Sequence, residues 1–280
     1  MKKFTLKAIF LMALLFVGFQ LTGRGQDFYD GFTGTGDISN NNGWTIHSGT
    51  GIIPINSGSL VYTGLQAPVG NRVTIPGNNT AVSADVNASL TVGTVDAAYY
   101  SALINVIDNT QIKTSPDYFM SFGATSGAAV TILGARLGIK SVNTAANYRL
   151  CIGNTSGGTL TYTDFAQDLD FGTTYLVVVK YDRSVSPTVA YLWVNPTSLG
   201  GSEPTGFVSC NTGTSAFSTF ASICIRNSSN TPKADIDEIR VGTTWAQVTP
   251  TGTVHYVATP VITPPAGVYT TPQTITMTCD

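Results

Sequence analysis

The stretch TYLVVVKYDRSVSPTVAYLWVN, residues 174–195, decides the fold. Residues 175–181 are apolar on both faces of an extended chain, which is typical of a central strand covered on each side. The following run alternates, so that Tyr191 and Trp193 share one strand face while Leu192 and Val194 share the other. These two runs, separated by a segment with Ser and Pro, predict two neighbouring β-strands.

Working outward from this pair, the same period-2 pattern recurs along the chain, and no helical period lasts longer than a turn or two. Ten strands of this length predict an all-β fold, a two-sheet antiparallel jelly-roll sandwich. The ten expected strands are 58–64, 81–92, 98–108, 117–122, 129–140, 147–153, 173–181, 188–195, 220–226 and 234–242. The residues expected in the core are Trp44, Leu103, Ile104, Tyr118, Phe122, Val177, Val179, Ile223 and Ile239.

Composition supports a folded β protein and argues against one class of partner. Charged residues make up 11% of the 280 residues, against about 25% in an average globular chain. The hydrophobic fraction of 42% is too high for a disordered chain. Beyond residue 25, ten Lys and Arg face sixteen Asp and Glu, a net charge of -6. Nucleic acid is therefore not expected as a partner.

The N-terminus has the three parts of a secretory signal peptide. A basic stretch, MKKFTLK, precedes the apolar run AIFLMALLFVGF, and a more polar end with Gly23 and Gly25 follows. The apolar run of 12 residues is shorter than the roughly 20 needed to span a bilayer. Residues 1–25 are therefore predicted to be a signal peptide, which implies a secreted or cell-surface protein with no membrane span after its removal.

The pattern changes after residue 250. The first domain is expected over residues 26–250, and a charge-free, Thr-rich linker over 251–257 follows it. Residues 258–280 begin a new alternating pattern, and four of the chain's thirteen prolines fall between Pro260 and Pro272. We expect this segment to be the start of a second small β-sandwich, and the chain to be a fragment of a longer protein.

Several blocks of sequence carry a resemblance to known modules. DFYDGFTGTG, NNGWTIHSGTGIIPINSGSLVYTGL, TTYLVVVKYD, AYLWVNPTS and ADIDEIRVGTTWAQVTP resemble, in this order, a laminin-G-like, concanavalin-type jelly-roll module of Bacteroidetes secreted proteins. TPVITPPAGVYTTPQTITMTC resembles the opening of the chitobiase/β-hexosaminidase C-terminal domain. The first resemblance implies an exported module, mostly of unassigned activity. The second implies other domains of the same longer chain.

The search for catalytic residues favours a protein that is not an enzyme. The chain has only two histidines and no Gly-x-Ser-x-Gly sequence. The leading hypothesis is a non-catalytic module for adhesion or glycan recognition, with a polysaccharide or cell-surface glycan as partner. The first alternative is an enzyme of glycoside-hydrolase type that uses Asp168, Asp170 or Asp237 with Glu238. The second is a structural spacer without ligand.

The sequence offers two candidate binding sites, an aromatic pair and a group of aspartates. Tyr191 and Trp193 would lie outward if Leu192 and Val194 are core, and could stack on a sugar; a cross-strand aromatic pair with Tyr175 or Tyr181 is the alternative. No cofactor is expected except a possible structural calcium, since oxygen ligands suit an acidic, His-poor protein. Because first and last strands of jelly rolls are commonly neighbours, its ligands would come from Asp27, Asp30, Asp235 and Asp237.

The cysteines could pair in an oxidising compartment. Cys210 and Cys224 would close a loop of about 15 residues, which contributes roughly 3 kcal/mol in the chain-entropy model. Cys151 with Cys224 is the competing pair, because each shares its strand phase with an Arg, Arg149 or Arg226, and so a predicted outer face. Sequence spacing does not choose between them.

Overall fold

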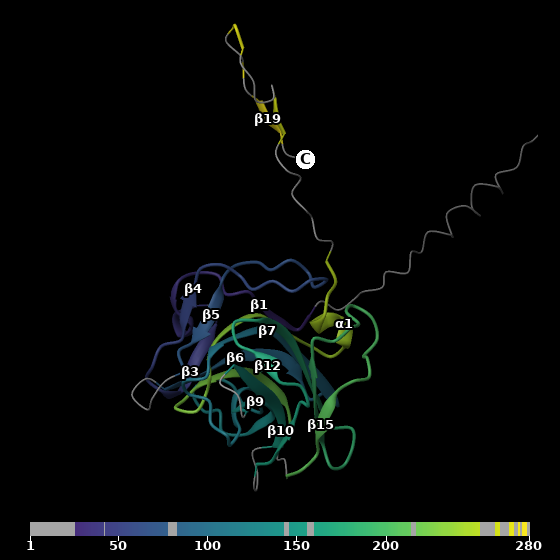
Figure 1. Cartoon of the computed structure of the whole chain (residues 1–280). Coiled ribbons are helices and arrows are strands. Elements are labelled where there is room, and N and C mark those ends of the chain that lie inside the picture. The colour runs from purple at the N-terminus through teal and green to yellow at the C-terminus, as the bar shows by residue number, and fades with distance from the viewer. Residues whose placement is uncertain are drawn as a thin grey trace, which may run out of the picture.

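The computed structural model describes residues 26–41, 43–77, 83–142, 146–155, 160–213, 217–252, 261–263, 269–271, 274 and 276–278 (Figure 1). The predicted signal peptide and Cys279 lie outside these residues, as does most of the predicted linker and second domain. The predicted domain boundaries therefore stay predictions.

Two antiparallel sheets make up the body of the molecule. The first has the strand order β15-β14-β13-β7-β17-β5-β4-β2, with β1 also paired to β17. Its strands are β1 (Phe28–Asp30), β2 (Gly36–Asp37), β4 (Pro54–Asn56), β5 (Arg72–Ile75), β7 (Ala97–Asp108), β13 (Thr174–Asp182), β14 (Val189–Val194), β15 (Val208–Cys210) and β17 (Lys233–Gly242). We call it the nine-stranded sheet.

The second, the eight-stranded sheet, has the order β11-β10-β9-β8-β16-β6-β3, with β12 paired to β10. Its strands are β3 (Trp44–Gly49), β6 (Ala84–Gly93), β8 (Asp117–Gly123), β9 (Leu133–Ser141), β10 (Asn147–Thr155), β11 (Tyr162–Asp164), β12 (Leu169–Asp170) and β16 (Phe220–Asn227). A 3-10 helix η1 (Ile38–Asn40), a short helix α1 (Trp245–Val248) and a separate hairpin of β18 (Val261–Thr263) and β19 (Thr276–Thr278) complete the described elements.

The main core lies between the two sheets and confirms the predicted fold class. Edge-to-face aromatic rings join the sheets: the Tyr100 ring of β7 lies 5.0 Å from Phe122 of β8, and Phe122 lies 4.9 Å from Phe220 of β16. Seven of the nine expected core residues belong to this cluster, all except Leu103 and Tyr118. Leu103 is buried in a second cluster, and Tyr118 is half-buried on an outer face.

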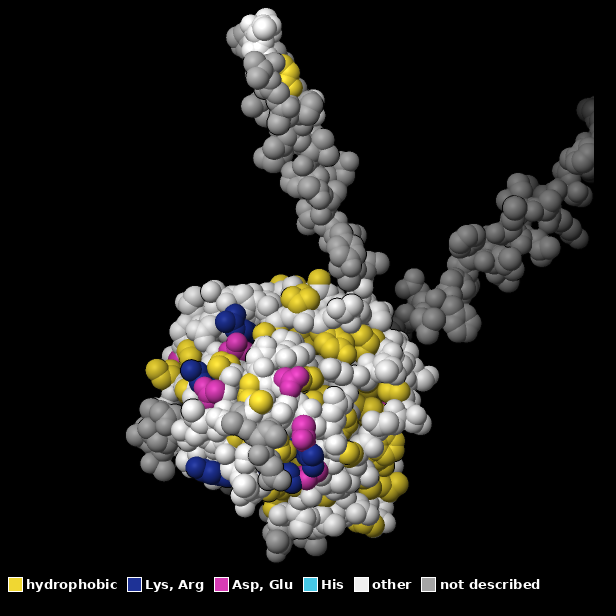
Figure 2. All heavy atoms as spheres, in the orientation of Figure 1, with side chains coloured by type: hydrophobic (Ala, Val, Ile, Leu, Met, Phe, Trp, Pro, Cys, Tyr) yellow, Lys and Arg dark blue, Asp and Glu magenta, His cyan; other side chains and the backbone are white. Residues whose placement is uncertain are grey.

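The second cluster covers the outer face of the nine-stranded sheet. Loops over residues 57–69 and 195–207, together with α1, fold onto this face and bury Trp193 and Trp245. The expected strand over 58–64 is wrong: this segment forms turns that carry Leu60 and Tyr62 to the cluster. The outer face of the eight-stranded sheet is different, because charged side chains gather there over β10 (Figure 2).

The first and last strands are neighbours, as expected for a jelly roll. β1 pairs with β17 so that Asp30 is opposite Ile239 and Phe28 is opposite Val241. The ladder between β17 and β7 shifts register between Asp237 and Arg240, where Glu238 has a φ of +54°. This left-handed residue makes a bulge, which changes the direction of the side chains that follow it. Among the described residues, no helix has the length and apolarity that crossing a membrane requires.

Candidate functional site

Arg136 comes from β9 and points away from the core. Its neighbours Leu137 and Ile139 belong to the alternating sequence GARLGIK, and both are buried in the main core. Since successive side chains of a strand point to opposite faces, Arg136 belongs to the outer face of the eight-stranded sheet, as does Lys140 of the same strand. Arg136 is half-buried, so part of its side chain is open to solvent.

Arg226 reaches the same outer face from β16. Ile223 and Ile225 fill the core, and Arg226 points outward with the phase predicted from sequence. Its guanidinium binds two carboxylates: Nη1 lies 2.8 Å from Asp117 Oδ1, and Nε lies 3.9 Å from Asp85 Oδ2. The positive charge of Arg226 is therefore compensated within the sheet.

Tyr118 of β8 lies between the two arginines. β8 is paired with β9 on one side and with β16 on the other, so both guanidinium groups reach the same ring. The Cζ atoms of Arg136 and Arg226 each lie 4.5 Å from the centroid of the Tyr118 ring. Both contacts are cation–π interactions, and they hold the flat guanidinium groups in a fixed place on the sheet.

Tyr162 of β11 adds a second phenol beside this stack. A Cβ at Gly138 would lie 2.8 Å from Tyr162 Cε1, and a Cβ at Gly153 would lie 2.9 Å from the same atom. The Tyr162 ring therefore lies directly on two glycines of adjacent strands, which have no side chain to keep it away. Glycine inside a strand commonly allows such a close approach. The Tyr162 hydroxyl is buried and has no hydrogen-bond partner among the described residues. We call Tyr118, Arg136, Tyr162 and Arg226 the outer-face cluster.

The protonation states of the cluster follow from burial. Burial raises the pKa of Tyr162 and of Tyr118, while nearby arginines act in the opposite direction. Both phenols are therefore protonated at neutral pH, and neither can act as a base there. Burial, opposed by Arg226 and reinforced by Asp117, raises the pKa of Asp85 to about 6.

The predicted aromatic pair is outward-facing, but the structure covers most of it. Leu192 lies in the main core and Val194 packs against it, so Tyr191 and Trp193 do share the outer face of β14. Trp193 is 1% exposed, and its Nε1 donates to the Pro204 carbonyl at 3.0 Å. Tyr191 is half-buried against Trp193 rather than paired with Tyr175 or Tyr181. Trp193 therefore presents no ring face to a sugar in this structure.

The four aspartates of the predicted calcium site are not brought together. Asp30 faces inward and accepts hydrogen bonds from Trp44 Nε1 at 2.8 Å and Phe32 N at 2.7 Å. Asp235 is paired with Arg72 at 2.7 Å, and Asp237 accepts from Leu60 N at 2.7 Å. Within the part of the chain that the structure describes, we find no group of three or more His, Cys, Asp or Glu side chains that could hold a metal ion. Asp27 therefore does not complete a site with the other three aspartates.

The predicted disulfide between Cys210 and Cys224 is also corrected. The three cysteines within the described residues, Cys151, Cys210 and Cys224, are free thiols. Cys210 lies in the main core on the nine-stranded sheet, whereas Cys224 lies outside the core with Val130 and Leu133. The competing pair fails because β9 and β8 separate Cys151 on β10 from Cys224 on β16, a distance of about three strand spacings or 14 Å.

The alternative hydrolase residues are likewise divided between the sheets. Asp168 binds Arg149, with Arg149 Nε at 2.9 Å from Oδ1, and Asp170 accepts from Asn147 Nδ2 at 2.6 Å, both beside the eight-stranded sheet. Asp237 and Glu238 lie on β17 of the other sheet. The structure therefore does not bring the first pair of acids to the second.

Glu238 takes part in a buried network at the junction of β1 and β17. Its carboxylate accepts from Tyr29 Oη at 2.6 Å, from Val69 N at 3.2 Å and from Arg240 Nη2. Arg240 also lies over the Tyr29 ring, with Cζ 4.9 Å from the centroid. Burial and the Glu238 carboxylate raise the pKa of Tyr29. This network joins the first strand to the last.

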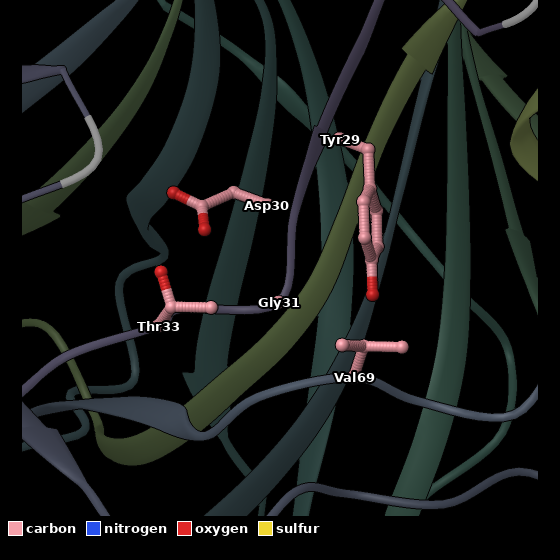
Figure 3. A pocket seen from close by; sticks show the side chains of 5 residues that line it. All are labelled: Tyr29, Asp30, Gly31, Thr33 and Val69. Atoms are coloured by element: carbon pink, nitrogen blue, oxygen red, sulfur yellow. The ribbon is translucent and has the colours of Figure 1, made fainter.

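A hollow of about 300 Å³ lies next to this network. It is lined by Tyr29, Asp30, Gly31, Thr33 and Val69 (Figure 3). The Asp30 and Thr33 side chains turn toward each other, while the Tyr29 hydroxyl points toward Val69. The Asp30 carboxylate and the Tyr29 hydroxyl are already hydrogen-bonded within the protein, so the hollow offers few free polar groups.

Sequence reasoning missed the outer-face cluster apart from the outward phase of Arg226. Two signals were available: Arg136 alternates with core residues in GARLGIK, and Gly138 and Gly153 interrupt two neighbouring strands. Tyr118 was placed in the core because DYFMSF reads as a regular strand. The ladder between β8 and β9 shifts register between Tyr118 and Met120, and this irregularity changes the face to which Tyr118 points.

Comparisons with known proteins relate the chain to others by fold. No family model matches the sequence, and no curated protein matches it. The structure is similar to an endo-β-1,4-glucuronan lyase from Trichoderma reesei, with a TM-score of 0.49, 12% identity, and coverage of 80% of this chain and 98% of the lyase. It is also similar to the potassium-bound carbohydrate recognition domain of Emp46p, with a TM-score of 0.41, 9% identity and coverage of 77% and 95%. A third similar structure is alginate lyase PA1167 from Pseudomonas aeruginosa, with a TM-score of 0.43, 11% identity and coverage of 72% and 97%.

These similarities agree with the jelly-roll sandwich and correct one expectation. The chain was expected not to be an enzyme because it lacks the common hydrolase motifs. That expectation is not kept, because the structures similar to this chain include a glucuronan lyase and an alginate lyase. At identities of 12% and lower, what the three share with this chain is the fold.

Proposed function

We propose that the chain recognises a glycan on the outer face of the eight-stranded sheet, with the outer-face cluster as the binding site. The observation that carries the proposal is the Tyr162 ring lying on Gly138 and Gly153 beside Arg136, whose side chain is partly open to solvent. Sugar rings have an apolar C–H face that packs on an aromatic ring and hydroxyl groups that accept hydrogen bonds from guanidinium donors. The cluster supplies both.

The rigidity of the cluster supports binding. The β-ladders on either side fix the backbone of Tyr118, and its ring holds Arg136 and Arg226. A site whose side chains are already in place loses less conformational entropy when a ligand binds. Trp193 of the other sheet is not accessible to a ligand, because the loop over residues 195–207 covers it.

The test is a binding screen of the purified protein against soluble polysaccharides, followed by variants. Tyr162→Ala should weaken binding of the polysaccharide that binds best by about fivefold, since an aromatic contact contributes about 1 kcal/mol. Tyr62→Ala, which alters a half-buried tyrosine in the loop that covers the opposite sheet, is the matched control and should leave affinity unchanged. Equal affinities of wild type and Tyr162→Ala would contradict the proposal.

Cleavage of the same glycan is a second candidate function, and Asp85 favours it. Its pKa of about 6 leaves this carboxyl partly protonated near neutrality, and Asp117 provides a second carboxylate on the same Arg226. A carboxyl group with a raised pKa beside a second carboxyl group is an arrangement that acid–base catalysis on a glycosidic bond uses. Incubation with the bound polysaccharide, analysed for new reducing ends, tests this function; Asp85→Asn should abolish any release.

The proposed setting is the cell exterior. A glycan-binding module fits the predicted signal peptide over residues 1–25 and the resemblance to modules of Bacteroidetes secreted proteins. The resemblance of residues 258–280 to the start of a chitobiase-type C-terminal domain suggests further domains in the same chain. Mass spectrometry of the secreted protein tests the first point: the mature chain should begin at Gln26 or Asp27.

A further inference from the structure

The charges on the outer face of the eight-stranded sheet are unevenly compensated. Lys140 is ion-paired with Asp164, and Arg149 binds Asp168. Arg226 binds Asp117 and Asp85. Among the described residues Arg136 has no acidic partner, and its contact is with the ring of Tyr118. One positive charge of this face is therefore left without a counter-charge.

Two hydrogen-bond donors of the cluster also lack an acceptor. Arg136 Nε and the Tyr162 hydroxyl are both buried, and neither has a partner among the described residues. Both atoms are closed to solvent, so a ligand meets Arg136 through the part of its side chain that is open to solvent. The two side chains are close enough for the Arg136 charge to lower the pKa of Tyr162 against the larger effect of burial.

We infer that the glycan bound at the outer-face cluster is acidic, a polyuronate whose carboxylate is received by Arg136. This inference rests on the proposed function and names its ligand class. A carboxylate supplies the missing negative charge and two acceptor oxygens. Its planar shape matches the guanidinium fork, which can bind it through two parallel hydrogen bonds.

Stacking on Tyr118 strengthens the case for a carboxylate. The ring contact restrains the position of the Arg136 guanidinium, so less freedom is lost when the ligand arrives. A lysine at this position would have a flexible point charge without a fork. The geometry therefore favours a planar anion over a tetrahedral sulfate ester or a neutral hydroxyl.

The experiment measures affinity for polygalacturonate and polymannuronate, each compared with its methyl ester, which keeps the sugar and removes the charge. Wild type should bind at least one polyuronate tenfold or more tightly than the corresponding ester. Arg136→Gln should remove this difference, and Arg136→Lys should restore it only in part. Arg149→Gln, which alters an arginine of the same face that already has acid partners, is the matched control and should keep the difference.

Several results would overturn the inference. Equal affinity for polyuronate and ester, or a preference for acid that Arg136→Gln leaves intact, would show that Arg136 only packs on Tyr118. Dextran sulfate bound as tightly as polyuronate, with the same dependence on Arg136, would remove the selectivity for carboxylate. A neutral polysaccharide whose binding requires Tyr162 but not Arg136 would overturn the acidic ligand and keep the proposed function. Binding to a polyuronate that Tyr162→Ala leaves unchanged would contradict the proposed function instead.

Discussion

The Tyr29 hydroxyl donates a 2.6 Å hydrogen bond to Glu238 Oε1, joining two residues 209 positions apart in the chain. The bond links β1 to β17 and so ties the first strand of the sandwich to the last. Glu238 is 1% exposed, and its carboxylate depends on protein donors in place of water. Buried charged groups are costly unless such donors are complete.

Tyr29→Phe should therefore destabilise the fold. The variant keeps the ring under Arg240 and removes one donor to a buried carboxylate, which should lower the free energy of unfolding by about 1–3 kcal/mol in urea denaturation. Tyr62→Phe is the control, because the Tyr62 hydroxyl has no hydrogen bond within the described residues. A loss of the same size in both variants would show that the Tyr29–Glu238 bond contributes nothing specific.

Asp237 should give stability a measurable pH dependence. Burial raises its pKa from 3.8 to about 7, against the hydrogen bonds from Leu60 N and Glu238 N that act to lower it. Between these two values the folded state holds a proton that the unfolded state releases, so the contribution of Asp237 to stability is largest below about pH 4 and falls as the pH rises to about 7. The fall cannot exceed about 1.4 kcal/mol per pH unit.

Asp237→Asn isolates this effect, because Asn does not titrate. Melting temperatures at pH 4, 5.5, 7 and 8 should decline less steeply for Asp237→Asn than for wild type, and the two profiles should run parallel above about pH 8. Profiles that are parallel over the whole range would mean that Asp237 does not titrate as its burial implies.

The packing of Tyr162 on Gly138 and Gly153 can be tested by adding one methyl group. A Cβ at position 138 would lie 2.8 Å from both Cys151 Sγ and Tyr162 Cε1, so Gly138→Ala should displace the Tyr162 ring. We expect a loss of about 1–3 kcal/mol in unfolding free energy and weaker glycan binding, since overpacking at this position forces side chains to move. Gly201→Ala, whose nearest atom would be Ser198 Oγ at 3.7 Å, should change stability by less than about 0.5 kcal/mol.

How much the sequence predicted depends on how regular each strand is. The alternation in residues 174–195 predicted two neighbouring strands, and β13 and β14 do pair along that stretch. The short strands β2, β4 and β5 have two to four residues each, too few for a period to show. They exist because they pair with one another and β5 with β17, which is a long-range property that a local pattern does not contain.

The site was harder to predict because the placement of its side chains also depends on long-range contacts. The phase of Tyr191 and Trp193 was right, yet the loop over residues 195–207 covers Trp193, and loop placement depends on contacts such as Trp245 Nε1 to Ser198 O at 3.0 Å. A bulge at Glu238 and irregular pairing at Tyr118 change the face of the sheet to which the side chains at these positions point. An alternation rule assumes an unbroken ladder, so it fails at these points.

Trp193 is expected to act in packing rather than in ligand binding. Trp193→Ala should lower the free energy of unfolding by about 3–5 kcal/mol, because it empties a buried site between Trp245 and Phe207. The effect on the affinity of the folded protein for glycan should be small, as measured below the unfolding transition. A folded, stable Trp193→Ala variant that has lost glycan binding would return the site to the outer face of β14.

The central claim, that a glycan binds over the eight-stranded sheet, is tested most directly by amide hydrogen exchange with and without the polysaccharide that binds most tightly in the screen. The account predicts added protection in β9 and β11, around Arg136 and Tyr162, and none in β14. Protection confined to β14 and the loop over residues 195–207, with exchange in β9 and β11 unchanged, would contradict it.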